Sequence, residues 1–102
     1  MKIYLAGPMT GYTDFNFPHF AQMAKTLRDL GHEVTNPAEI DMGPNPTWGD
    51  CMRADIAALI QCTGIAMLRG WELSRGASLE HHIAKSLSMQ ILCAYQLAEA
   101  KE

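Results

Sequence analysis

Two carboxylates lie beside the apolar faces of two predicted helices, where a charge is costly unless it is partnered or hydrated. Glu80 borders one such face, and Gly76, one turn before it, has no side chain to block it. Asp55 borders the buried face of another helix. A pair of this kind can act as nucleophile and acid/base when the two environments separate the pKa values. Each residue has an ordinary alternative: a solvated helix glutamate for Glu80, and a first- or second-turn aspartate favoured by the helix dipole for Asp55.

Other residues could hold a ligand near this pair. Tyr4 lies in the middle of a predicted strand, and its hydroxyl, if buried, needs a partner that a cleft carboxylate would supply. Ser74 suits a helix N-cap, and the free N–H groups of a helix start can also bind phosphate, a contact that Arg75 would reinforce. Trp71 and Trp48 either stack on a base or pack within the protein, and the sequence leaves both roles open.

Three common kinds of site have little support. Residues 7–11, GPMTG, contain neither the Gly-Lys-Ser/Thr of a Walker loop nor a GxGxxG motif, which argues against ATP hydrolysis and NAD-dependent hydride transfer. The three cysteines have no CxxC or Cys/His ligand spacing, and the adjacent His81 and His82 would face different ways on a helix. We therefore expect no metal site and no cofactor.

Alternating strands and helices must position these residues. Apolar runs predict strands at residues 3–6, 32–36, 63–68 and 89–95, followed by a short polar tail. Helices are expected between a cap at Asn16 and a terminating Gly31, from about 49 or 50 to 61, and from about 75 to 88. His19 is expected on a helix surface without a partner. Residues 36–48, with three prolines, form a long loop of the kind that is usually functional or mobile.

This order of elements predicts the fold class. Strands separated by helices pair in parallel through right-handed crossovers. We expect one α/β domain over residues 1–102, a small flavodoxin-like doubly wound parallel sheet with four strands in the order 2-1-3-4 and helices on both faces. The switch point then lies between strands one and three, so residues 7–15 and 69–74 should face each other across one crevice.

Charge and apolar patterns argue against two classes of partner. The net charge is −3 and no Lys/Arg cluster occurs, so we expect no nucleic-acid polymer as a partner. No apolar stretch reaches 18 residues, and the first apolar run is too short for a signal peptide, so no membrane partner is expected. An odd number of cysteines, three, indicates reduced thiols and a cytoplasmic location.

Three short motifs resemble the nucleoside 2-deoxyribosyltransferase superfamily, most closely a group of short, uncharacterised bacterial and phage domains placed in it. They are IYLAGP at residues 3–8, RADI at 53–56 and SRGASLE at 74–80. The resemblance covers nearly the whole chain in the order of its elements. It implies a flavodoxin-like fold and action on nucleosides or nucleotides, with no metal or cofactor. It also implies a homodimer or larger homo-oligomer, with the second or third helix at the interface.

The same resemblance implies roles for individual residues. Glu80 matches the nucleophile that attacks the anomeric carbon, Tyr4 the tyrosine that orients it, and Asp55 the aspartate that helps the base to leave by proton transfer. The predicted substrate-binding residues are Gly7, Pro8, Ser74, Arg75, Gly76 and Trp71.

Three departures from the superfamily bear on the substrate. Ser74 stands where deoxyribosyltransferases carry an aspartate and where deoxynucleoside 5′-monophosphate N-glycosidases have a phosphate-binding serine. This favours a nucleotide substrate and hydrolysis. The chain also lacks the long C-terminal segment that completes a neighbouring subunit's site in typical transferases, and residues 36–48 have no clear counterpart there.

The sequence therefore predicts an N-glycosidase or deoxyribosyltransferase that acts on (deoxy)nucleotides or nucleosides through a covalent glutamyl-glycosyl intermediate. The main alternative is a catalytically inactive nucleotide-binding domain, for example a phage protein that captures a signal nucleotide. A small flavodoxin-like electron carrier has less support, because residues 7–13 are a weak version of the Ser/Thr-rich phosphate loop that it needs.

Overall fold

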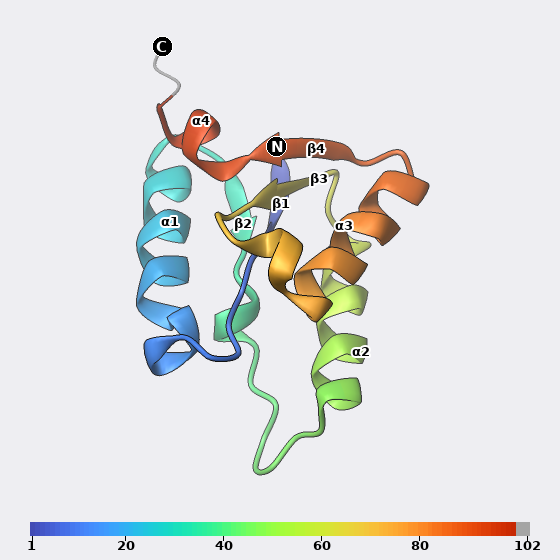
Figure 1. The fold of residues 1–102 in the computed structure, drawn as a ribbon. Coiled ribbons are helices and arrows are strands. Elements are labelled where there is room, and N and C mark those ends of the chain that lie inside the picture. Colours follow the sequence, from blue (N-terminus) through green and yellow to red (C-terminus); the bar gives the residue numbers. More distant parts are fainter. Residues whose placement is uncertain (100–102) are drawn as a thin grey trace.

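Four parallel strands form the central sheet of the computed structural model, which describes residues 1–99 (Figure 1). The strands are β1 (Lys2–Ala6), β2 (Glu33–Thr35), β3 (Gly64–Met67) and β4 (Gln90–Cys93). They are hydrogen-bonded in the order β2-β1-β3-β4, and every pairing is parallel. The predicted α/β class and the strand order 2-1-3-4 are thus confirmed, and the arrangement is consistent with a flavodoxin-like fold.

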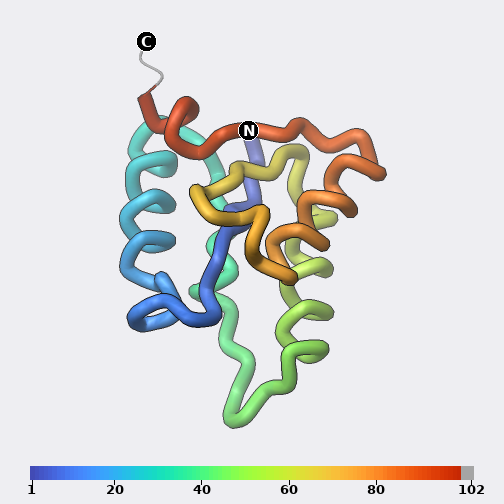
Figure 2. Tube along the Cα trace, in the orientation of Figure 1, coloured from blue at the N-terminus to red at the C-terminus, as the bar shows by residue number. Residues whose placement is uncertain are grey.

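Helices cover both faces of this sheet, and the chain path in Figure 2 shows the two pairs. One face packs against α1 (Phe17–Asp29) and the short α4 (Ala94–Glu99). The other face packs against α2 (Trp48–Leu59) and α3 (Arg75–Ser86). No helix among the described residues has the length and apolar character needed to cross a membrane.

Strand β1 feeds both cores because successive side chains of a strand point to opposite faces. Ile3 and Leu5 lie in the core with α1, whereas Tyr4 and Ala6 lie in the core with α2 and α3. All four are fully or almost fully buried. This alternation carries the Tyr4 hydroxyl toward the helices on which Asp55 and Glu80 lie.

Local hydrogen bonds fix the starts of the two helices on that face. Thr47 and Asp50 form a capping box at α2, in which each side chain accepts a backbone N–H of the other residue at 3.0 Å. Ser74 caps α3 as predicted, accepting the N–H of Ala77 at 3.2 Å. Asn16 precedes α1 but does not cap it with its side chain, which donates to the carbonyl of Pro8 instead.

The C-terminal end differs from the prediction. Strand β4 ends at Cys93 rather than at Tyr95, and helix α4 stands where a polar tail was expected. The prediction for His19 was also wrong, because its Nε2 lies 2.9 Å from the Tyr95 hydroxyl and the two rings are stacked. The same hydroxyl accepts the backbone N–H of Arg69 at 3.0 Å. These contacts to α1 and to the segment after β3 hold Tyr95 in a helix, a tertiary effect that local periodicity does not encode.

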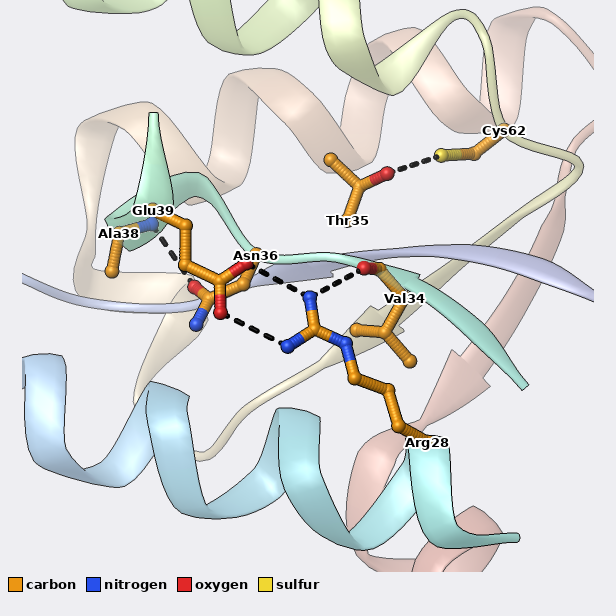
Figure 3. Close-up of polar contacts among 7 residues, drawn as sticks. All are labelled: Arg28, Val34, Thr35, Asn36, Ala38, Glu39 and Cys62. Atoms are coloured by element: carbon orange, nitrogen blue, oxygen red, sulfur yellow. Dashed lines mark hydrogen bonds and ion pairs between the residues drawn. The ribbon is translucent and has the colours of Figure 1, made fainter. Parts of the chain in front are cut away.

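The long loop after β2 is anchored at its beginning (Figure 3). Residues Pro37–Glu39 form a 3-10 turn, and the buried Asn36 accepts the N–H of Ala38 at 3.0 Å. Arg28 of α1 donates to both carboxylate oxygens of Glu39 and to the carbonyl of Val34. The first part of the predicted loop therefore has a defined position at the mouth of the crevice described next.

Candidate active site

A cleft of about 1050 Å³ opens at the carboxyl ends of β1 and β3. This is the switch point of the sheet, where ligands of open α/β proteins bind. Residues of both predicted loops, after β1 and after β3, line it, and the starts of α2 and α3 and the long loop complete the walls. The two loops are in close contact, because a Cβ atom on Gly70 would lie 2.9 Å from the Tyr12 hydroxyl. Of the predicted site residues, the lining includes Gly7, Pro8, Asp55, Ser74, Arg75, Gly76 and Glu80.

Glu80 is buried and hydrogen-bonded. Its side chain is 5% exposed, and the fully buried Tyr4 donates its hydroxyl proton to Oε2 at 2.6 Å. Tyr4 comes from β1 and Glu80 from the second turn of α3, so the contact joins the sheet to the helix. The alternative of a solvated helix glutamate is therefore wrong, and the predicted Tyr4–Glu80 pair is present.

Asp55 faces the same cleft from α2 and is half-buried. Burial raises its pKa to about 6. Burial also raises the pKa of Glu80, to about 8, with the hydrogen bond from Tyr4 acting in the opposite direction and the charge of Asp55 adding to the rise. The pKa of Tyr4 lies well above its usual value, because of burial first and of the Glu80 charge next. Between pH 6 and 8 the two carboxyl groups therefore hold one proton, mainly on Glu80.

Two glycines allow close approaches around the cleft. A Cβ atom on Gly7 would lie 2.7 Å from the Cβ of Leu68, so the segment after β1 can pass the end of β3 only without a side chain. A Cβ on Gly76 would lie 3.1 Å from the sulfur of Met52, which places Gly76 at the contact between α3 and α2. The second glycine brings together the two helices that carry the carboxylates.

The two tryptophans have different positions. Trp48, the first residue of α2, lines the cleft, and the guanidinium carbon of Arg75 lies 3.8 Å from its ring centroid. Trp71 does not line the cleft. It stacks on His81 at a centroid distance of 4.3 Å and borders a smaller hollow on the other side of the loop after β3. The structure therefore does not bring Trp71 together with the other predicted substrate-binding residues.

Sequence reasoning missed the aromatic rim of the cleft, formed by Tyr12, Phe15 and Phe17. All three side chains are exposed, and Phe15 is 61% exposed. Phe15 lies between Asp14 and Asn16, and all three residues have φ between +51° and +63°. Such left-handed backbone is costly for residues other than glycine. The sequence signal was limited to the Asp and Asn that flank Phe15, since these residue types tolerate this conformation best.

Side chains that could hold a metal do not cluster in the part of the chain that the structure describes. Among residues 1–99 no group of three or more His, Cys, Asp or Glu side chains is suitably placed for an ion. The polar and charged side chains that line the cleft are Thr10, Tyr12, Cys51, Asp55, Ser74, Arg75 and Glu80. The Tyr4 hydroxyl bonds Glu80 from beneath the lining, because Tyr4 is fully buried.

Comparison with protein families assigns the chain to a family. The model of a family described as "Domain of unknown function (DUF4406)" matches residues 1–93. The chain belongs to the DUF4406 family. The part that matches DUF4406 includes Tyr4, Asp55 and Glu80 and ends at the last residue of β4. A comparison with curated proteins gives no match.

Proposed function

We propose that this DUF4406 chain is an N-glycosidase or deoxyribosyltransferase, which breaks the bond between sugar and base in a nucleotide or nucleoside. The observation that carries the proposal is the buried Glu80, held by the Tyr4 hydroxyl at 2.6 Å and facing a cleft that it shares with Asp55. A buried carboxyl group at a ligand-sized cleft is costly for folding, and such groups concentrate at functional sites. The resemblance to the nucleoside 2-deoxyribosyltransferase superfamily suggests the same three residues.

The proposed reaction has two steps. An oxygen of ionised Glu80 attacks the anomeric carbon as the bond to the base breaks, and the bonding electron pair leaves with the base. Asp55 gives its proton to the departing base nitrogen. Water then attacks the same carbon, Asp55 takes a proton from it, and the Glu80 carboxylate is released. In a transferase, the nitrogen of a second base replaces water.

Ligand binding must move the proton before the first step. Without a ligand the proton resides mainly on Glu80, since the pKa of Glu80 is about 8 and that of Asp55 about 6. Moving it to Asp55 costs about 3 kcal/mol for a difference of two pKa units. A bound base covers the half-exposed Asp55 and favours its neutral form, whereas positive charge developing on the sugar favours ionised Glu80. The reaction needs one proton on the pair, so we expect a bell-shaped pH profile with limbs near pH 6 and pH 8.

Ser74 and Arg75 favour a phosphorylated substrate. The Ser74 oxygen accepts the N–H of Ala77, which leaves the hydroxyl proton free to be donated toward the cleft. Arg75 is the one basic residue among the described residues that line the cleft. Hydrolysis of a nucleoside 5′-monophosphate is therefore the preferred version of the proposal.

A base-release assay tests the proposal. Purified protein is incubated with deoxynucleosides and their 5′-monophosphates, and free base is separated by chromatography. Release by the native chain, with loss in Glu80→Gln, supports the nucleophile assignment. Glu72→Gln is the matched control, because Glu72 is an exposed carboxylate that does not line the cleft. Equal activity in Glu80→Gln and the native chain rejects the assignment.

A catalytically inactive nucleotide-binding domain is the second candidate. The pKa of about 8 supports it, because a neutral Glu80 carboxyl can donate a hydrogen bond to a ligand without attacking it. Calorimetry that detects nucleotide binding, together with no base release from any substrate, favours this candidate. The expected homo-oligomer stays a prediction, which light scattering of the purified chain tests.

A further inference from the structure

Among the described residues that line the cleft, Arg75 and Trp48 form a stacked pair to which the proposed reaction assigns no catalytic step. Arg75 is the first residue of α3 and Trp48 the first residue of α2, so the pair bridges the two helices that carry the carboxylates. Both side chains line the cleft, and Trp48 remains 41% exposed. The contact therefore lies where a ligand would enter.

The flat face of the Arg75 guanidinium stacks on Trp48, and the N–H groups at its edge remain available to a ligand. The ion pairs of residues 1–99 involve Lys2, Lys25, Arg28 and Arg53, and none involves Arg75. Within the same range, no hydrogen bond from its guanidinium is found either. A guanidinium stacked on an aromatic ring keeps its N–H donors in the plane of the fork, which matches two oxygens of one phosphate. Its charge is thus available to an anion.

Trp48 has a fixed position from which to hold the guanidinium. The capping box of Thr47 and Asp50 fixes the turn in which it lies. A free arginine side chain loses considerable rotamer freedom when it binds an anion, and a side chain that is already stacked loses less. The indole therefore improves anion binding without touching the anion.

We propose that Trp48 is a positioning residue that presents Arg75 to a single phosphate group, so that the cleft selects nucleoside monophosphates over both nucleosides and triphosphates. This deepens the proposed function and depends on it for the identity of the ligand. The charge of the lining supports one phosphate only, because the single cation, Arg75, shares the cleft with the largely ionised Asp55. A triphosphate would bring further negative charge toward Asp55 with no second cation among the lining residues described.

Calorimetric binding tests the inference in a Glu80→Gln background, where turnover is blocked. The ligands are inorganic phosphate, a deoxynucleoside, and its 5′-monophosphate and 5′-triphosphate. We expect the monophosphate to bind most tightly. Arg75→Gln should weaken monophosphate binding about 10- to 100-fold, the range for a lost charge-assisted hydrogen bond, and leave deoxynucleoside binding unchanged. Arg75→Lys should give an intermediate loss, because it keeps the charge without the fork.

Substitutions of Trp48 separate positioning from simple packing. Trp48→Leu should weaken monophosphate binding about 2- to 5-fold and spare the deoxynucleoside, and Trp48→Phe should restore most of the loss because it keeps an aromatic face. Equal effects of Trp48→Leu on both ligands would overturn the inference, as would triphosphate binding as tight as that of the monophosphate.

The two proposals fail in different ways. Selective monophosphate binding without base release by the native chain retains the Arg75–Trp48 inference and rejects the enzymatic function. Base release with a KM for the monophosphate that Arg75→Gln does not change retains the function and rejects the inference.

Discussion

The two faces of the sheet are built on different principles. The core against α1 and α4 consists of apolar side chains, with Phe20 and Leu27 of α1 fully buried against Ile3 and Leu5 of β1. The core against α2 and α3 contains the Tyr4 hydroxyl and Glu80, and it opens into the cleft. Strand β1 contributes to both cores, because its successive side chains point to opposite faces of the sheet.

This difference assigns stability mainly to the α1 face of the sheet and chemistry to the face that packs against α2 and α3. Apolar burial on the α1 side stabilises the fold mainly through side chains that need no hydrogen-bond partner, with the Tyr95 hydroxyl as the exception. On the α2 and α3 side a buried carboxyl group lowers stability whenever it is ionised, and that cost is accepted where a reactive group is needed. The predictions below test the division, beginning with the largest expected effect.

Replacing Glu80 should separate activity from folding most clearly. Glu80→Gln keeps the shape of the side chain and an acceptor for Tyr4 but removes the nucleophile. We expect base release to fall at least 1,000-fold, which corresponds to about 4 kcal/mol of barrier. Base release and chemical denaturation at pH 6 are the measurements. If the variant is unfolded at pH 6, Glu80 belongs to the fold as much as to the site, and the contrast between the faces fails.

The site face should make stability depend on pH. The pKa of Glu80 is about 8 in the folded protein and 4.5 for the ordinary group, so the folded state binds this proton more tightly. Its contribution to stability is complete below pH 4.5 and is lost as the pH rises toward 8. Between pH 5 and pH 8 the native chain should lose roughly 3–4 kcal/mol of unfolding free energy from this group. Denaturant titrations at both values measure the loss.

The control for that measurement is the same Glu80→Gln variant. It retains Asp55, whose pKa is also raised, so the difference between the two proteins isolates Glu80. The variant should match the native chain at pH 5 and exceed it at pH 8. Parallel pH curves for the two proteins would contradict a raised pKa at Glu80.

A cavity in the α1 core should lower stability and spare activity, the reverse of the effect expected for Glu80→Gln. Leu27→Ala removes a fully buried side chain from the α1 core and should lower the free energy of unfolding by about 3 kcal/mol. The activity of each folded molecule should remain, because Leu27 does not line the cleft. Denaturation and kcat measured below the unfolding transition check both statements. A large fall in kcat of the folded variant would mean that the α1 core shapes the site directly.

The smallest expected effect follows from removing the hydrogen bond between Tyr4 of β1 and Glu80 of α3. Tyr4→Phe removes the hydroxyl that bonds Glu80 and should cost about 1 kcal/mol of stability. That hydrogen bond lowers the pKa of Glu80, so its loss should raise this pKa further above 8. The upper limb of the pH–activity profile should move to higher pH. An unmoved limb would assign it to another group.

The sheet could be predicted from sequence because its signals are local. Four apolar runs separated by helical periodicity define the strands, and the handedness of crossovers leaves few orders for them. The end of β4 could not be predicted, because the apolar run from Ile91 continues to Tyr95. In the structure the strand ends at Cys93, and the Tyr95 hydroxyl in α4 bonds to His19 and Arg69, which are distant in sequence.

The site was predictable to the extent that topology determines it. Tyr4, Asp55 and Glu80 follow from the strand alternation and from two helices on one face. The two tryptophans show the limit of prediction from topology. Trp71 lies in the predicted loop 69–74 but stacks on His81, whereas Trp48 lines the cleft from the start of α2. Neither outcome has a local signal. The position of Trp71 depends on where α3 places His81, and that of Trp48 on how α2 and α3 approach at Gly76 and Met52.

The short C-terminal helix has a practical consequence for where this domain ends. The DUF4406 match stops at residue 93, yet Ala94 is fully buried and Tyr95 and Leu97 pack against the α1 core. A fragment cut at residue 93 would uncover that side of α1 and leave the Arg69 N–H without its acceptor. The folding unit is therefore longer than the stretch that sequence similarity recognises.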